Sequence, residues 1–168
     1  APSFGPSVRQ FGFRDRSNST HAMNHEEIRA IQDVIRQSCG HMREAGFDGV
    51  MLHGSHAAMI EQFVSPYFNE RTDEYGGSFE NRIRFLVEFL EAAREGCGPG
   101  MALGIRINCD EQVAGGYDTG TAREVVAAIC QRGLVDFVDL DVGLEPQQLH
   151  HGMPTAFSDV QYYRPFVE

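Results

Sequence analysis

The sequence predicts an α/β fold built around a parallel sheet, and the alternation of helix-like and strand-like stretches is the main observation. Three short apolar runs, at 48–52, 101–107 and 135–142, are typical of buried strands. Amphipathic stretches of helical length precede each of them. Strands that alternate with helices in this way form βαβ units, whose parallel strands are usually buried on both faces.

Each expected helix has residues that begin or end helices. The three expected helices cover 24–47, 79–96 and 121–133. Asn24 can cap the first helix, whose first turn is acidic, and Gly46 ends it. Ser78 can cap the second helix, which carries an apolar stripe. We therefore expect the order helix, strand, helix, strand, helix, strand.

The 168 residues are enough for one domain with a core. Residues 1–20 are rich in Gly, Pro, Ser and Arg and are expected to be a loop, 24–142 the core βα units, and 143–168 a loop or tail. Three strands cannot close a barrel, which needs roughly 250 residues for eight strands. The chain is thus either a small open α/β domain or the middle of a barrel, and since it starts without Met we expect a fragment.

Composition excludes several classes of partner. The net charge of −10 argues against nucleic acid and anionic membranes. No apolar stretch approaches the roughly 18 residues of a spanning helix, and no secretory signal is visible. The four cysteines form no C-x-x-C pair, so structural zinc or an iron–sulfur site is not predicted from them. We expect reduced thiols in a cytoplasmic protein.

Residues able to carry chemistry follow the expected strands, at the carboxyl edge where parallel α/β folds place their sites. His53 ends the first strand and His56 lies just beyond it, while Arg106 sits inside "LGIRI". A buried guanidinium needs an acceptor. It can form a structural ion pair with Asp139 or Asp141, or it can face a cofactor or substrate.

The two histidines leave three interpretations open from the residues alone. They can be incidental, they can bind an oxygen or amine of a substrate, or they can bind a metal. The metal interpretation needs a third ligand, which Asp141, His150 or His151 can supply.

The loop before the second helix supplies further charged residues. Arg71, Asp73, Glu80 and Arg82 are expected to form an ion-pair cluster that braces the loop against the helix. We expect these residues to shape the mouth of the site without taking part in chemistry.

Taken together, these stretches resemble the old yellow enzyme family of flavin oxidoreductases. The resemblance runs from about Asn24 to Val142, and R-T-D-E-Y-G-G-S-x-E-N-R-x-R-F at 71–85 is highly specific to that family. The stretches "HAMNHEEIRAIQDV" and "HHGMP" look more like the trimethylamine dehydrogenase and N-demethylase branch. The resemblance implies an FMN-binding TIM (β/α)₈ barrel, of which this chain holds about strands four to six.

The resemblance also implies roles for individual residues. His53 and His56 match a pair that lies over the flavin and binds the substrate's oxygen or amine. Arg106 matches an arginine that approaches the flavin N1 and C2 carbonyl, where a positive charge favours the reduced, anionic flavin. The substrate-binding interpretation of the histidines then leads, and no metal is expected. One departure is Ala58, which stands where alkene reductases of the family carry a proton-donating tyrosine.

The function expected is hydride transfer between FMN and a small organic substrate, an amine or N-methyl compound, with NAD(P)H as a candidate reductant. The alternative within the family is an enoate or 2,4-dienoyl-CoA reductase. Outside it, the alternatives are a non-catalytic truncated barrel fragment and a metal-dependent barrel hydrolase. The segments that hold the FMN phosphate in the family lie beyond residue 168. We therefore expect the remaining barrel strands, or self-association, to be needed.

Overall fold

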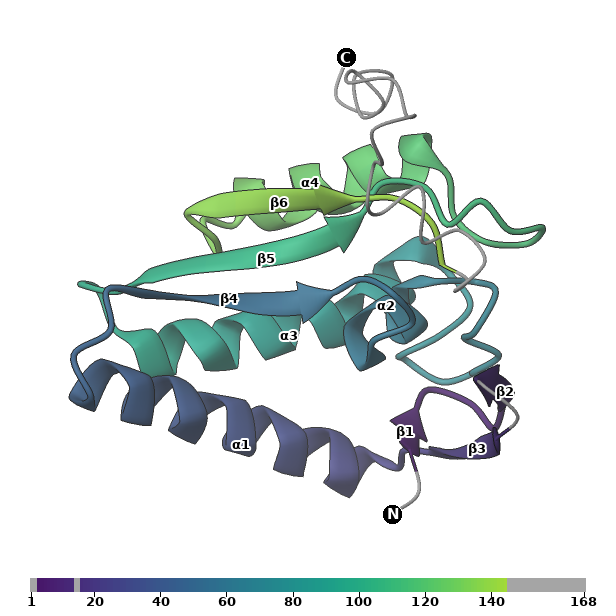
Figure 1. Cartoon of the computed structure of the whole chain (residues 1–168), viewed down its shortest axis with the longest axis horizontal. Coiled ribbons are helices and arrows are strands. Elements are labelled where there is room, and N and C mark those ends of the chain that lie inside the picture. The colour runs from purple at the N-terminus through teal and green to yellow at the C-terminus, as the bar shows by residue number, and fades with distance from the viewer. Residues whose placement is uncertain (1–2, 14–15, 145–168) are drawn as a thin grey trace.

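The computed structural model describes residues 3–13 and 16–144, and its main body is a parallel sheet with helices on one side (Figure 1). The expected alternation is confirmed. The elements of this body are α1 His25–Glu44, β4 Gly49–Gly54, α2 Met59–Val64, α3 Phe79–Cys97, β5 Ala102–Asn108, α4 Thr119–Gln131 and β6 Phe137–Asp141.

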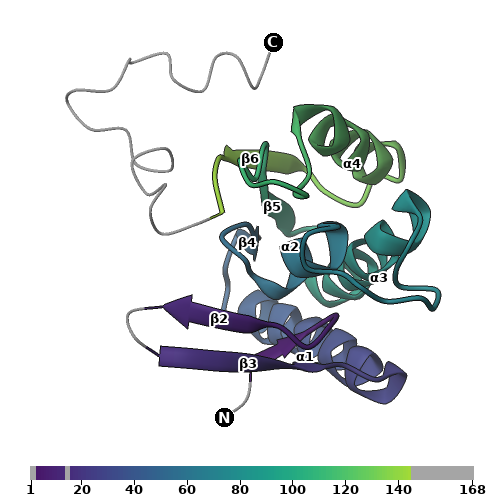
Figure 2. The same ribbon diagram turned by 90° about the vertical axis from the view of Figure 1, so that its right-hand side faces the viewer.

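The three strands pair in the order β4-β5-β6, and both pairings are parallel. Their register places His53 beside Arg106 and Arg106 beside Asp139. Figure 2, which looks along the strands, shows the helices gathered on one side of the sheet. Right-handed crossovers put successive helices on the same face only when the strands are added in one direction, as they are in a (β/α)₈ barrel.

The two faces of the sheet differ in burial. Side chains that point toward the helices, such as Leu52, Ile105 and Leu103, are buried. On the opposite face Met51 is 47% exposed and Phe137 is 45% exposed. Burial on both faces is therefore wrong for the described residues, because no described element covers this second face. Each strand consequently presents one row of side chains on this open face, and the row includes His53 and Arg106, although Asn108 and Asp141 at the strand ends are buried.

The core lies between the sheet and the helices. Phe63 of α2 stacks on Phe85 of α3 with ring centroids 4.0 Å apart. Helices α1 and α3 approach closely at Gly96, where a Cβ atom would lie 2.2 Å from the Arg36 carbonyl oxygen. The expected caps are present: Asn24 and Glu27 form a capping box on α1, and the Ser78 side chain accepts from the Asn81 amide on α3.

Two regions differ from the sequence prediction. The loop expected over 1–20 is wrong, since β1 Ser3–Gly5, β2 Gln10–Phe13 and β3 Arg16–Ala22 form a second small sheet in the order β1-β3-β2. This sheet is formed by backbone pairing, and the Gly-, Pro- and Ser-rich composition of its strands is the reason that the sequence predicted a loop instead. The short helix α2 was also missed. The tail expected over 143–168 lies, from residue 145 on, outside the described residues.

Two sequence expectations concern cysteines and membranes. Among the four cysteines, Cys39, Cys97 and Cys109 are buried, Cys130 is exposed, and all four are free thiols. Within the described part of the chain, no helix combines the length and the apolar character needed to cross a bilayer.

Candidate functional site

The structure brings the three sequence-predicted site residues together at the carboxyl ends of β4 and β5. His53 and Arg106 are register partners on neighbouring strands, so both point to the open face. The Arg106 Nε lies 2.6 Å from Asp139 Oδ2, and its Nη1 lies 3.9 Å from Asp141 Oδ2. The ion pair with Asp139, which the sequence left as one alternative, is thus present on a side chain that remains 36% exposed.

His56 lies in the turn that follows β4. Its ring centroid is 5.5 Å from that of His53, and its Nε2 is 3.0 Å from Asp141 Oδ2. Asp141 ends β6, two strands away, and its side chain is only 6% exposed. The backbone of the turn is unusual, since His56 and Ala57 both have positive φ, at 55° and 56°. Neither is a glycine, so both residues are in a conformation that L side chains rarely adopt.

The electrostatic setting favours the neutral form of one imidazole, that of His53. Partial burial lowers the pKa of His53, and the neighbouring His56 and Arg106 lower it further, while Asp141 acts in the opposite direction. A neutral imidazole has one donor and one acceptor nitrogen. His53 can therefore contact either a carbonyl oxygen or an amine hydrogen at neutral pH.

A buried polar layer lies beneath this turn, and the sequence analysis did not identify it. The Ala57 backbone amide donates to Glu61 Oε2 at 2.5 Å, and the Gln62 side-chain Nε2 donates to the Ala57 carbonyl at 2.7 Å. Asn108 Nδ2 donates to Glu61 Oε1 at 2.7 Å. The available signal was the polar pair Glu61–Gln62 inside the apolar stretch "MIEQFV", where two buried polar residues in succession require partners.

Two carboxylates in this layer have strongly shifted acidities. Burial raises the pKa of Glu61 to about 8, and the nearby Glu111 contributes to that rise. Burial also raises the pKa of Glu111 to about 7, against the effect of its hydrogen bond from Ser65. Tyr117, whose hydroxyl donates to the Asn108 carbonyl at 2.9 Å, has a pKa raised by burial and by the same two carboxylates.

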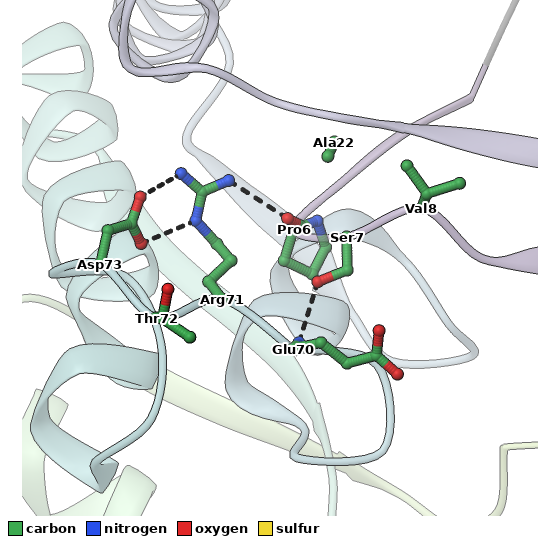
Figure 3. A pocket seen from close by; sticks show the side chains of 8 residues that line it. All are labelled: Pro6, Ser7, Val8, Ala22, Glu70, Arg71, Thr72 and Asp73. Atoms are coloured by element: carbon green, nitrogen blue, oxygen red, sulfur yellow. Dashed lines mark hydrogen bonds and ion pairs between the residues drawn. The ribbon is translucent and has the colours of Figure 1, made fainter.

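The 69–78 loop is braced by Arg71. Its Nε donates to Asp73 Oδ1 at 2.9 Å, and its Nη1 donates to the carbonyls of Pro6 and Met23. These contacts, some of them drawn in Figure 3, line an open pocket of about 390 Å³ between the loop and the first sheet. The bond from Arg71 lowers the pKa of Asp73 to about 2. The loop is thereby tied to β1 and to the start of α1.

The other two members of the expected ion-pair cluster, Glu80 and Arg82, do not form an ion pair with each other in the described chain. Arg82 donates to the carbonyls of Val64 and Gly77, and the ion pairs found among the described residues include none formed by Glu80. The bracing role expected for this loop is therefore carried out largely through backbone carbonyls.

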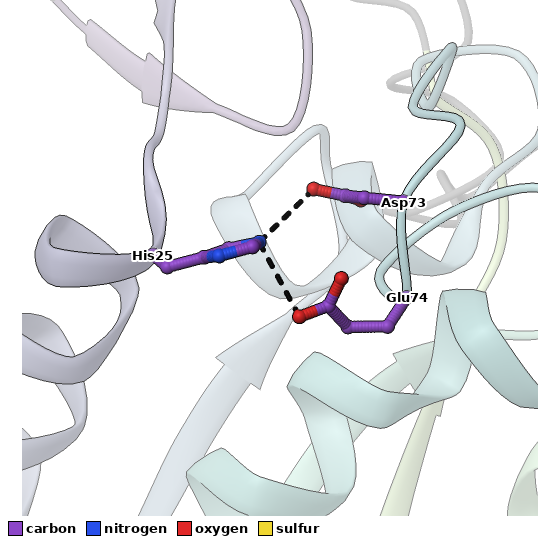
Figure 4. A group of neighbouring side chains, drawn as sticks. All are labelled: His25, Asp73 and Glu74. Atoms are coloured by element: carbon purple, nitrogen blue, oxygen red, sulfur yellow. Dashed lines mark hydrogen bonds and ion pairs between the residues drawn. The ribbon is translucent and has the colours of Figure 1, made fainter.

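The described residues contain one grouping of three potential metal ligands, and it lies away from the strand ends. It consists of His25, Asp73 and Glu74, with His25 Nε2 at 3.1 Å from Asp73 and 3.5 Å from Glu74 (Figure 4). Because Arg71 already neutralises Asp73, an ion-pair network accounts for this grouping. His53 and His56 belong to no such grouping in the described chain, and His150 and His151, named as third ligands, lie outside it.

The donor set at the strand ends fits the electron-rich pyrimidine edge of a flavin in chemical kind. It combines a guanidinium with two imidazoles on one accessible face, and the buried Asn108 Oδ1 has no hydrogen-bond partner in the structure. Asp139 offsets part of this positive charge, since it already accepts a hydrogen bond from one edge of the Arg106 guanidinium. The site thus has the positive charge that such a cofactor needs, although the Arg106 guanidinium is also paired with the Asp139 carboxylate.

Parallel strands with helices on one face and polar groups at their carboxyl ends define a segment of a (β/α)₈ barrel enzyme. The family model described as "NADH:flavin oxidoreductase / NADH oxidase family" matches residues 5–148. The chain belongs to this family, as the resemblance implied.

Individual relatives extend this finding. Over 112 residues the chain is 39% identical to N,N-dimethylglycine/sarcosine dehydrogenase of Chromohalobacter salexigens, covering 67% of this chain and 16% of the relative. It is 36% identical over 132 residues to NADPH dehydrogenase of Bacillus velezensis, covering 78% of this chain and 38% of that protein. The chain therefore spans well under half the length of these curated relatives.

Solved structures give the same fold. Histamine dehydrogenase from Rhizobium sp. 4-9 superposes with a TM-score of 0.78 at 31% identity, over 84% of this chain and 21% of that chain. Morphinone reductase superposes with a TM-score of 0.72 at 26% identity, over 99% of this chain and 46% of that chain. The expected assignment to the central part of a TIM barrel of the old yellow enzyme family is confirmed.

Proposed function

We propose that residues 1–168 form the central part of the FMN-binding barrel domain of an oxidoreductase that transfers hydride between FMN and a small organic substrate, preferably an amine or N-methyl compound. The observation that carries this proposal is the convergence of His53, His56 and Arg106 at the strand ends. Similarity to a dimethylglycine/sarcosine dehydrogenase and to a histamine dehydrogenase supports the amine class.

Each of the three residues has a distinct role in this proposal. Bound FMN supplies the hydride acceptor. Arg106 holds the flavin's pyrimidine edge, where its charge favours the reduced form. His53 and His56 contact the oxygen or amine of the substrate, and the neutral state of His53 lets it accept as well as donate a hydrogen bond. NAD(P)H is the reductant proposed for the reaction in the reductive direction.

A second candidate is an enoate or 2,4-dienoyl-CoA reductase. The chain is 39% identical over 104 residues to 12-oxophytodienoate reductase 2 of Arabidopsis thaliana, and a 2-naphthoyl-CoA reductase superposes with a TM-score of 0.78. Ala58 weighs against this candidate. It is the residue that precedes helix α2, and its methyl group cannot donate the proton that reduction of an alkene requires.

The setting proposed is a cytoplasmic one in which the open face of the sheet is covered by further barrel strands or by self-association. Met51 and Phe137 are the exposed apolar residues of that face. The three buried free thiols fit a reducing compartment. Neither nucleic acid nor a membrane is proposed as a partner, given the net charge of −10.

Visible spectroscopy of the purified chain with added FMN tests this proposal. We expect a flavin band that survives desalting where self-association, or the remaining barrel strands, completes the site. Arg106→Ala should weaken FMN binding by about tenfold or more, since a charge-assisted bond to the flavin is lost. Arg36→Ala, which removes an exposed ion-paired arginine far from the strand ends, is the matched control. His53→Ala and His56→Ala should retain FMN but lose affinity for a secondary or tertiary amine.

Three results would contradict the proposal. A wild-type protein that stays colourless even when the remaining barrel strands are supplied would favour the non-catalytic fragment. Equal FMN affinity in Arg106→Ala would refute the role of that residue. Unchanged amine affinity in both histidine variants would refute substrate binding by them.

A further inference from the structure

The turn that carries His56 is held at a single residue, Ala57, by two neighbouring residues of α2. The Ala57 amide donates to Glu61 Oε2 at 2.5 Å, and the Ala57 carbonyl accepts from Gln62 Nε2 at 2.7 Å. We propose that Glu61 and Gln62 are positioning residues, which fix the left-handed turn at His56–Ala57 and thereby aim the His56 ring at Asp141. This inference rests on the proposed function of His56 and names the residues that maintain it.

The turn needs such support because its backbone is unfavourable. His56 and Ala57 have φ values of 55° and 56°, and residues with a Cβ atom avoid this region. Two such residues in succession persist only where surrounding contacts determine them. Both backbone hydrogen-bonding groups of Ala57, its N–H and its C=O, are satisfied here by α2, so the turn cannot relax without breaking at least one of these bonds.

Both α2 side chains are themselves fixed. Glu61 is 1% exposed, and its second oxygen accepts from Asn108 Nδ2, which also donates to the Gly143 carbonyl. Gln62 is 7% exposed and packs against β1, where a Cβ atom on Gly5 would lie 2.4 Å from Gln62 Oε1. Glycine at position 5 therefore leaves the space that the Gln62 amide occupies.

The consequence is a defined place for the His56 ring. Its Nε2 lies 3.0 Å from Asp141 Oδ2, and its centroid lies 5.5 Å from that of His53. A turn that relaxed to negative φ would carry the ring away from both neighbours. The polar pair in α2 thus controls the geometry of the histidine pair without touching a substrate.

NMR spectroscopy of the full chain measures this geometry directly, whether or not a cofactor is bound. In the wild type we expect a nuclear Overhauser effect between the His53 and His56 rings and slow exchange of the Ala57 amide. Gln62→Ala should remove the ring contact and speed exchange of the Ala57 amide by about tenfold. Gly5→Ala should do the same from a distance, because the new methyl group displaces the Gln62 amide.

Rescue by glycine separates positioning from a general loss of structure. In Gln62→Ala combined with Ala57→Gly, the left-handed conformation has little cost, so the remaining Glu61 bond should restore the ring contact. Gln32→Ala is the matched control. It removes one glutamine bond, to Glu88 Oε2 at 2.8 Å between α1 and α3, and should leave the histidine contact unchanged.

The outcomes are distinct from those of the proposed function. A ring contact that persists in both Gln62→Ala and Gly5→Ala, or is not restored by Ala57→Gly, would overturn the positioning role. Failure of the amine-binding test for His56→Ala would refute the proposed function and leave this geometric result intact. Should Gln62→Ala not fold, Gly5→Ala carries the same test with both α2 side chains unchanged.

Discussion

Asp141 Oδ2 lies 3.0 Å from His56 Nε2, so a residue at the end of β6 determines where a side chain that follows β4 is placed. The same oxygen lies 3.9 Å from Arg106 Nη1. One largely buried carboxylate therefore faces two of the proposed site residues, Arg106 on β5 and His56 after β4. Together with Asp139, it supplies the negative charge in a group that also contains two imidazoles and a guanidinium.

Asp141→Asn should lower the pKa of His53 further. Burial is the main cause of the lowered pKa of His53. The neighbouring His56 and Arg106 lower this pKa further, and the Asp141 charge opposes them. Asp141→Asn removes the charge that raises the pKa of His53. The side-chain amide of the new asparagine can still accept a hydrogen bond from His56. The measurement is an NMR titration of the His53 ring. Glu95→Gln, at an exposed ion pair with Arg36, is the control. A His53 pKa that rises or stays constant in Asp141→Asn would contradict this account.

Ala57→Gly should stabilise the fold by about 1 kcal/mol, because glycine adopts the left-handed conformation without the steric cost that alanine has. Chemical denaturation measures the change in the free energy of unfolding. The same substitution at exposed Ala127, in the middle of α4, is the control and should destabilise by about 1 kcal/mol. Equal destabilisation at both positions would show that the positive φ at Ala57 carries no strain.

Asn24→Ala should destabilise the chain by about 1 kcal/mol through the loss of the cap on α1. The Asn24 side chain accepts from the Glu27 amide at 2.9 Å, and the Glu27 side chain accepts from the Asn24 amide at 2.8 Å. Asn24→Ser keeps a capping oxygen and should retain most of the stability. Thermal or chemical unfolding distinguishes the two variants, and equal losses in both would exclude the cap as the cause.

The sequence predicted the main body well because its signals are local. Asn24 and Ser78 mark helix starts by short-range bonds to the backbone, and apolar spacing identifies α1 and α3. The placement of His53, His56 and Arg106 at one edge followed from the topology of parallel strands. The small first sheet could not be predicted, since pairing of β1 with β3 depends on backbone contacts between residues 17 positions apart, such as Ser3 and Thr20.

The polar layer beneath the site escaped prediction for a different reason. Glu61 comes from α2, while Asn108 and Glu111 lie close together at and after the end of β5, and nothing in the sequence shows that these two segments meet. Glu61 looks like an ordinary helix residue until its 1% exposure is known. Likewise, positive φ is usually signalled by glycine or asparagine, and neither His56 nor Ala57 gives that signal.

Stability should fall as the pH rises toward 8, because two buried carboxyl groups are protonated more readily in the folded chain than in the unfolded one. Burial raises the pKa of Glu61 from 4.5 to about 8 and that of Glu111 from 4.5 to about 7. Between pH 4.5 and these values the folded state binds more protons, so stability decreases with pH and levels off above about pH 8. His53, whose pKa is lowered from 6.5, has the opposite effect, confined to pH values below about 6.5.

The window from pH 6.5 to 8.5 therefore isolates the two carboxyl groups. We expect the free energy of unfolding to fall by roughly 2–3 kcal/mol across it, as measured by chemical denaturation at each pH. Glu111→Gln should remove its share of the decrease. Since the Glu111 charge is one cause of the raised pKa of Glu61, the remaining decrease should also level off at a lower pH in this variant. Glu95→Gln, on the exposed surface, should leave the profile unchanged. A wild-type profile that is flat or rises between pH 6.5 and 8.5 would mean that both groups are ionised in the folded state despite their burial.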